Sequence, residues 1–183
     1  HDLMGDDAGQ MPEAIKGVML SCILSDTLAF RSPTTTPQDK ALAESLAADL
    51  NLTIADYAAE MFAAKSDVSA FSDAELLRMD SKEYAVSGTK FRVSVLETTS
   101  PKMVLDRKAN LMATMPSVAQ EDAVDHVLLF VIDILNEQAT MFIPNATVQT
   151  VAEKSFGATV TGDTVVLSGV MSRKKQIIPN LKV

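Results

Sequence analysis

Three consecutive cations near the C-terminus are the residues of this sequence whose types and spacing best suit a chemical task. Arg173, Lys174 and Lys175 lie between Ser172 and Gln176, with apolar runs on both sides. Arg offers a planar fork that can hold two phosphate oxygens, whereas Lys acts as a compact point charge. A basic triplet fixed at the end of a strand can therefore grip a polyanion, although a short charge run alone is more often a solvated face.

A lone carboxylate is the second residue of chemical interest. Asp26 lies in an otherwise apolar run and is followed by the polar segment 30–34. Burying an unpaired carboxylate is costly, so a metal ion, an Arg or backbone N–H groups are expected to pair with it. A hydrogen-bonded Asp inside a helix and a metal ligand fit this pattern equally well.

Three other residues could contribute chemistry but suit structural roles when taken alone. Lys82 stands near the start of a predicted strand, and as one of 16 basic residues it is by default a solvated lysine. His126 opens an apolar strand, which favours a satisfied histidine in the core or at its edge. The one cysteine, Cys22, lies in an apolar run and is predicted to be a buried structural thiol.

Composition limits the class of protein. The chain has 183 residues, a net charge of −8 and 47% apolar residues, which suits a globular fold and argues against nucleic-acid binding. One cysteine excludes a disulfide framework and favours a reducing cytoplasm. No apolar run is long enough to span a membrane, and no basic segment leads into an apolar one as in a secretory signal. The start at His1, without an initiator Met, suggests a fragment.

Hydrophobic periodicity predicts an α/β fold with a helical start followed by a mixed β-sheet covered by helices. Thr36, Pro37 and Asp39 look like the N-cap, first turn and N3 position of one helix. A polar linker is expected at 65–72. The expected helices are 12–30, 38–50, 54–64, 73–79, 101–118 (interrupted or ended near Pro116) and 147–156, and the expected strands are 84–86, 91–96, 126–135, 140–143, 158–161 and 164–168.

Together these motifs resemble the manganese-dependent (family II) inorganic pyrophosphatases of the DHH phosphoesterase superfamily. The runs that carry the resemblance are 17–27, 30–34, 79–84, 132–135 and 172–179. Their order and approximate spacing agree from about Pro12 to the end of the chain. The C-terminal run is the most specific of them.

The resemblance implies two domains and a role for four residues. Residues 1–65 would be the C-terminal helical part of the catalytic DHH domain, and 66–183 the DHH-associated substrate-binding domain. Asp26 would be a metal ligand, and Lys82, Arg173 and Lys174 would bind pyrophosphate. The family's chemistry is hydrolysis of pyrophosphate by a metal-activated water, with manganese as the metal and magnesium or cobalt as alternatives.

The departure from the family pattern is large. The other metal-ligand motifs have no counterpart, since His1-Asp2 does not reproduce them and the chain has only two histidines. One Asp cannot hold a metal pair, so the chain alone is expected to be inactive and to bind little manganese. Loss of the rest of the catalytic domain would expose Met19, Cys22 and Ile23, and a homo-oligomer could cover them.

Two other functions stay open. An exopolyphosphatase of the same superfamily shares the C-terminal domain type but cleaves longer chains. A non-catalytic phosphate-binding or regulatory module is the second alternative, with residues 1–11 as the remnant of a junction to a regulatory insertion. Metal-ligand motifs upstream would favour an enzyme, and their absence a binding module.

Overall fold

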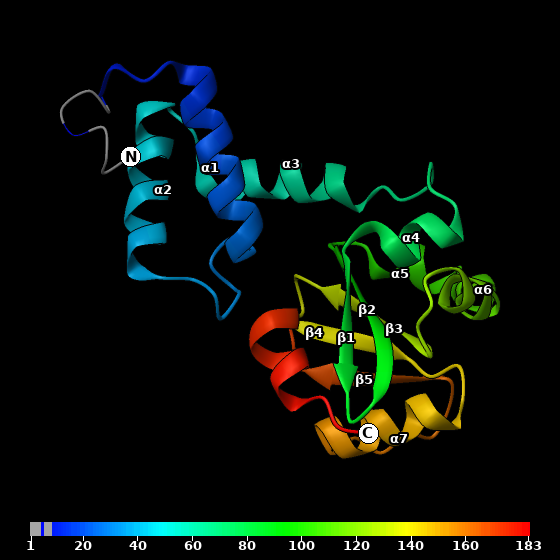
Figure 1. The fold of residues 1–183 in the computed structure, drawn as a ribbon. Coiled ribbons are helices and arrows are strands. Elements are labelled where there is room, and N and C mark those ends of the chain that lie inside the picture. Colours follow the sequence, from blue (N-terminus) through cyan, green and yellow to red (C-terminus); the bar gives the residue numbers. More distant parts are fainter. Residues whose placement is uncertain (1–4, 6–8) are drawn as a thin grey trace. The chain divides into compact units, whose positions relative to one another are not determined.

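The protein forms two compact units, residues 1–62 and 63–183, in a computed structural model that describes residue 5 and residues 9–183 (Figure 1). The division falls inside helix α3 (Ile54–Ser66). The expected linker at 65–72 is therefore wrong in its first two residues, which belong to this helix. Among the described helices, none is both long and apolar enough to cross a membrane.

The first unit contains α1 (Glu13–Thr27), α2 (Pro37–Asp49) and most of α3. The predicted start of α2 is confirmed, because Thr36 Oγ1 accepts a hydrogen bond from the Asp39 N–H while the Asp39 carboxylate accepts one from the Thr36 N–H. This reciprocal cap satisfies two N–H groups at the helix start.

Helix α1 ends three residues earlier than expected. Leu28, Ala29 and Phe30 have φ angles of 51°, 49° and 70°, the left-handed region that side chains other than Gly and Asn rarely adopt. Leu28 is nevertheless buried, and the Ala29 N–H donates to the Leu24 carbonyl at 2.8 Å. No Gly or Asn marks this helix end, so the end has no local signal in the sequence.

The second unit is built on a mixed sheet, as predicted, although the sheet has five strands and not the six expected. Its strands lie in sequence order, and only β2 and β3 are parallel to each other; the other neighbours are antiparallel. The chain crosses from β2 to β3 through α5 (Pro101–Leu105) and α6 (Lys108–Glu121). The strands are β1 (Ser81–Val86), β2 (Thr89–Thr98), β3 (His126–Asp133), β4 (Gln138–Phe142) and β5 (Thr164–Ser168).

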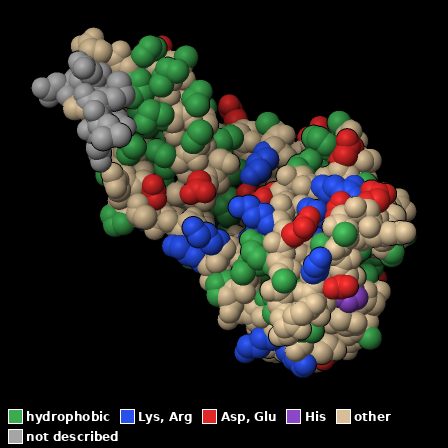
Figure 2. All heavy atoms as spheres, in the orientation of Figure 1, with side chains coloured by type: hydrophobic (Ala, Val, Ile, Leu, Met, Phe, Trp, Pro, Cys, Tyr) green, Lys and Arg blue, Asp and Glu red, His purple; other side chains and the backbone are tan. Residues whose placement is uncertain are grey.

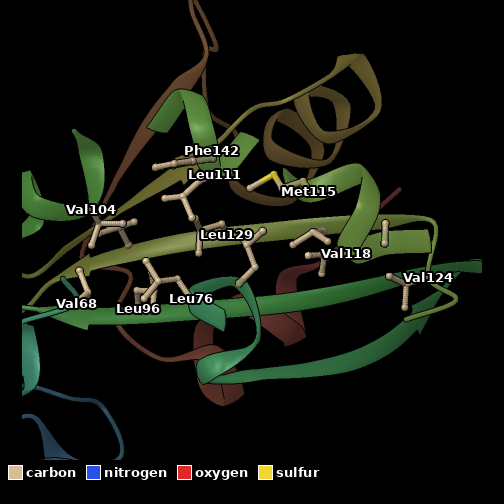
Figure 3. Close-up of a cluster of buried hydrophobic side chains, with 14 residues drawn as sticks. Val68, Leu76, Leu96, Val104, Leu111, Met115, Val118, Val124, Leu129 and Phe142 are labelled. Carbon is tan, nitrogen blue, oxygen red and sulfur yellow. The ribbon is translucent and has the colours of Figure 1, made fainter. Parts of the chain in front are cut away.

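Strand β3 is the buried centre of the sheet, which confirms its prediction from a continuous apolar run. Its odd-numbered residues, such as Leu129, pack in a cluster with side chains of α4 (Asp73–Met79), α5 (Pro101–Leu105) and α6 (Lys108–Glu121) (Figure 3). On the opposite face, Phe130 meets Phe156 of α7 (Ala146–Phe156) edge to face at 5.9 Å. Helices therefore cover both faces of the sheet.

The helix expected over 101–118 is two helices, and the break lies at Arg107, not near Pro116. The Arg107 guanidinium donates hydrogen bonds to the Asp73 carboxylate and to the carbonyls of Val68 and Phe71. These contacts from the preceding segment hold Arg107 at φ −92°, ψ 5°, outside helical geometry. Pro116 is accommodated within α6.

The strand expected at 158–161 is wrong, and Gly162-Asp163 is not the turn of a hairpin. Strand β5 pairs with β4 instead, with Leu167 opposite Ala139. Asp163 stabilises the pairing of β4 with β5, because its carbonyl accepts a hydrogen bond from the Ile143 N–H at 2.8 Å. A long-range pairing thus replaces the local one that the turn residues suggested.

The burial of β3 predicts a large cost for truncating its centre. Leu129→Ala should lower the free energy of unfolding by about 2–5 kcal/mol, because a fully buried leucine leaves a cavity. Chemical denaturation followed by circular dichroism measures this. Val166→Ala on β5, where the side chain is 54% exposed, is the control and should change stability by less than about 0.5 kcal/mol. Equal effects of the two substitutions would contradict the assignment of the core.

Candidate functional site

The basic triplet lies at the start of a short helical turn, not at the end of a strand as expected. Strand β5 ends at Ser168, and Gly169, at φ 73°, redirects the chain. Arg173–Ile177 then form a single wide helical turn, η2, which continues into η3 (Ile178–Asn180). The positive φ suits Gly, which carries no Cβ to clash.

Hydrogen bonds within the segment hold this turn in one conformation. The Gln176 Oε1 accepts from the N–H groups of Met171 and Ser172, both at 2.9 Å, and its Nε2 donates to the Gly169 carbonyl at 2.6 Å. The buried Ser172 caps η2 by accepting from the Lys175 N–H. Arg173 and Lys174 therefore extend from an ordered backbone, which lowers the entropy cost of holding a ligand.

Arg173 is joined to the start of the first strand, 93 residues earlier in the sequence. Its Nη1 donates to the Asp80 carbonyl at 2.7 Å, and its Nη2 donates to the Asp80 carboxylate at 2.8 Å. The Arg173 side chain is only 15% exposed. This pair of bonds fixes the plane of the guanidinium beside β1.

Strand register places Lys82 on the same side of the sheet as Asp80. Lys82 lies opposite Val93 of β2, and the Val95 N–H bonds the Asp80 carbonyl at 2.9 Å, so the pairing extends to Asp80. Residues two apart in an extended chain point to one face. The structure therefore brings Arg173 to the face that carries Lys82.

Lys82 and Lys174 are both exposed, and neither side-chain ammonium makes a hydrogen bond or ion pair with any residue that the structure describes. Lys174 follows Arg173 directly on η2. Charged donors with no internal partner are available to an external anion. The role of these two lysines and of Arg173 in binding pyrophosphate stays a prediction.

Asp26 lies in the last turn of α1 and is exposed, so its carboxylate does not carry the cost of burial that the sequence suggested. Its carbonyl accepts a hydrogen bond from Thr34 Oγ1 at 3.2 Å, which ties the helix end to the following loop. Within the described residues, no group of three or more His, Cys, Asp or Glu side chains could hold a metal ion. Asp26 thus remains a single predicted ligand.

The two predictions about structural side chains had different outcomes. His126 is partly buried at the start of β3 and stacks on Phe91 with ring centroids 5.9 Å apart, as expected for a histidine at the edge of the core. The prediction for Cys22 is wrong, because the thiol is exposed on α1. The residues His1 and Asp2 lie outside the described part of the chain.

An ion-pair cluster that the sequence did not reveal holds β1 and β2 to the helices. The Asp122 carboxylate accepts hydrogen bonds from Arg78 Nε, at 3.2 and 3.1 Å to its two oxygens, and lies 2.6 Å from Arg92 Nε. Arg92 in turn pairs with Glu83 of β1 at 2.6 Å. Burial raises the pKa of Asp122, but the Arg78 hydrogen bonds and the Arg92 charge outweigh it and leave this pKa below its ordinary value.

Known proteins match this chain in both sequence and fold. A family model described as the DHHA2 domain matches residues 59–183. A probable manganese-dependent inorganic pyrophosphatase of Deinococcus radiodurans is 42% identical over 90% of this chain and 54% of its own length. The manganese-dependent inorganic pyrophosphatase of Bacillus subtilis is 36% identical over 94% of this chain and 55% of its own length.

The fold also resembles that of solved structures. The putative family II inorganic pyrophosphatase of Methanococcus jannaschii superposes with a TM-score of 0.81 at 31% identity, over 93% of this chain and 55% of that one. The chain thus spans about half the length of the relatives that it matches.

The sheet, the helices on its two faces and the ordered basic turn define an α/β protein with a cationic turn after its last strand. Because the family model covers more than half of the chain, the protein belongs to the DHHA2 domain family.

The Asp122 cluster predicts acid sensitivity. A carboxylate whose pKa is lower in the folded than in the unfolded state stabilises the protein above its unfolded pKa, near 3.8, and this contribution is lost as the pH falls through the folded value. Wild-type stability should therefore decrease below about pH 4 more steeply than that of Asp122→Asn. Urea titrations at pH 7 and at several values between 4 and 2.5 measure the difference. Parallel curves for the two proteins would contradict this role for Asp122.

Proposed function

We propose that this chain supplies the pyrophosphate-binding domain of a manganese-dependent inorganic pyrophosphatase, which hydrolyses pyrophosphate to two phosphates. The single observation that carries the proposal is the attachment of Arg173 beside the strand that bears Lys82. Sequence relatives named as manganese-dependent inorganic pyrophosphatases support it. Lys82, Arg173 and Lys174 would donate to the phosphate oxygens, and Arg173 would offer the planar, two-point contact.

The proposal also assigns a separate function to each part of the chain. Residues 1–65 would be the end of a DHH catalytic domain and 66–183 the substrate-binding domain. Asp26 would be one manganese ligand. The described residues do not fit a complete manganese site, because a metal pair needs several carboxylate and imidazole ligands. The remaining ligands must then come from outside these residues.

An uncovered apolar surface on α1 supports this division. Ile15 and Val18 are 50% and 60% exposed, and the exposed Cys22 lies one turn further on the same face. Figure 2 shows hydrophobic side chains gathered on the helical unit. More of the catalytic domain, or a second copy of this chain, would cover such a surface. Of the predicted residues, Cys22 is exposed, whereas Met19 and Ile23 are partly buried.

A cytoplasmic location and the absence of nucleic-acid binding belong to the same proposal. The exposed Cys22 thiol is the only cysteine in the sequence and so suits a reducing compartment. A net charge of −8 opposes general binding to a phosphate backbone, whereas a local basic site still accepts a small anion.

The chain alone should bind phosphate and pyrophosphate weakly and should not hydrolyse pyrophosphate. Arg173→Ala should reduce the affinity for pyrophosphate at least about 10-fold, because charge-assisted hydrogen bonds contribute about 1.5–3 kcal/mol. Calorimetric titration at low salt, with metals chelated, measures this. Lys90→Ala, at the far end of the β1–β2 hairpin, is the control and should bind normally. Steady phosphate release by the pure chain, or binding that Arg173→Ala leaves unchanged, would refute these expectations.

A chimera tests the whole activity. Joining the chain to the upstream region of the Bacillus subtilis relative should give a protein that releases phosphate from pyrophosphate in the presence of manganese. Arg173→Ala in this chimera should lower kcat/KM at least about 100-fold, the usual loss when a cationic transition-state contact is removed.

The same chimera separates the alternatives. Preferential cleavage of tripolyphosphate would favour an exopolyphosphatase. A folded chimera that binds phosphate but hydrolyses neither compound would favour a non-catalytic module.

A further inference from the structure

The Asp80 carboxylate lies inside the cationic site and has no role in the proposed binding of an anion. It is bonded to Arg173 Nη2 at 2.8 Å, while the Asp80 carbonyl bonds Nη1 at 2.7 Å. A negative charge next to the residue proposed to bind a highly charged anion opposes that binding. Its presence therefore calls for a physical explanation.

The two groups of Asp80 act on Arg173 in different ways. The carbonyl belongs to the backbone, accepts from the Val95 N–H as well, and is fixed by the sheet. It therefore aims the guanidinium whether or not an anion is present. The carboxylate belongs to a side chain that is 55% exposed, so it can turn away from Arg173 into solvent.

Arg173 retains donors for a ligand while it is bonded to Asp80. A guanidinium carries five N–H groups, and Asp80 occupies two of them, which leaves three. An anion can thus bind the N–H groups of Arg173 that Asp80 leaves unoccupied. It can also compete with the Asp80 carboxylate for the N–H group of Nη2. The competition is electrostatic, so salt should weaken it.

We propose that Asp80 is a positioning residue that orients Arg173 through its carbonyl and limits the affinity of the site for phosphate anions through its carboxylate. This inference rests on the proposed function, since it takes Arg173 as the anion-binding residue. Asp80 holds the guanidinium in place when no anion is bound and weakens the retention of a bound one. A site with this property releases its anion more readily than one with three cations alone.

Asp80→Asn separates charge from shape, because the amide keeps an acceptor oxygen for Arg173 and loses the negative charge. We expect this variant to bind pyrophosphate about 3- to 10-fold more tightly than wild type at low salt, with the gain shrinking as salt is raised. Calorimetric titration of the 183-residue chain with inorganic pyrophosphate, with metals chelated, measures the change. Circular dichroism melting confirms that the variant is folded.

Glu83→Gln is a matched control. Glu83 pairs with Arg92 and its side chain is 56% exposed, much like that of Asp80. The substitution removes the same single negative charge, but from the other face of β1. Pyrophosphate affinity should be unchanged in this variant. An equal gain in Glu83→Gln would mean that Asp80 acts only through net charge, which would overturn the proposal.

The double variant Asp80→Asn/Arg173→Ala tests whether the effect passes through Arg173. In the Arg173→Ala background, the gain from Asp80→Asn should be reduced at least about 2-fold, as expected for two groups in contact. Unchanged or weaker binding in the single variant Asp80→Asn, or no binding in any variant, overturns the inference. If Arg173→Ala alone fails to reduce binding, the proposed function fails first; if it reduces binding but Asp80→Asn has no effect, only the role of Asp80 fails.

Discussion

The register of β1 against β2 is the constraint on which the candidate site depends. Lys82 opposite Val93 and Asp80 bonded to Val95 put both side chains on one face of the sheet, where Arg173 reaches Asp80. A shift of one residue would turn Lys82 to the other face, because side chains alternate along a strand. The Asp122 cluster opposes such a shift. It lies on the opposite face of the sheet, where Arg92 pairs both with Glu83 of β1 and with Asp122, the residue that follows α6.

An acidic protein can still present a local cationic site when its charges are segregated by contact. The acidic residues Asp122, Glu121 and Glu83 are paired with Arg78 and Arg92 on one face of the sheet. On the other face, Arg173 is ordered and two lysines lack an internal partner among the described residues. Screening limits the reach of a charge to about 8 Å at physiological ionic strength, so a net charge of −8 does not decide what this site binds.

Elements with a strong local signal were predicted well, and those set by distant contacts were not. The capping box at Thr36 and the apolar run of β3 are confirmed. The break at Arg107 depends on Asp73, Val68 and Phe71, which precede it by more than 30 residues, and no local pattern encodes these contacts. For the site, the family resemblance implied roles for Lys82, Arg173 and Lys174. It implied none for Asp80, although Asp80 lies in the same run as Lys82, because the role of Asp80 depends on its long-range bond to Arg173.

Periodicity, capping and motif order are local properties of the chain, so the α/β class, the central strand and the family could be predicted without any structure. The exposure of Cys22 and Asp26 and the contact between Asp80 and Arg173 depend instead on how the folded chain packs. The physical reason is distance along the chain: 93 residues separate Asp80 from Arg173, and only strand pairing and the packing of the C-terminal turn bring them together.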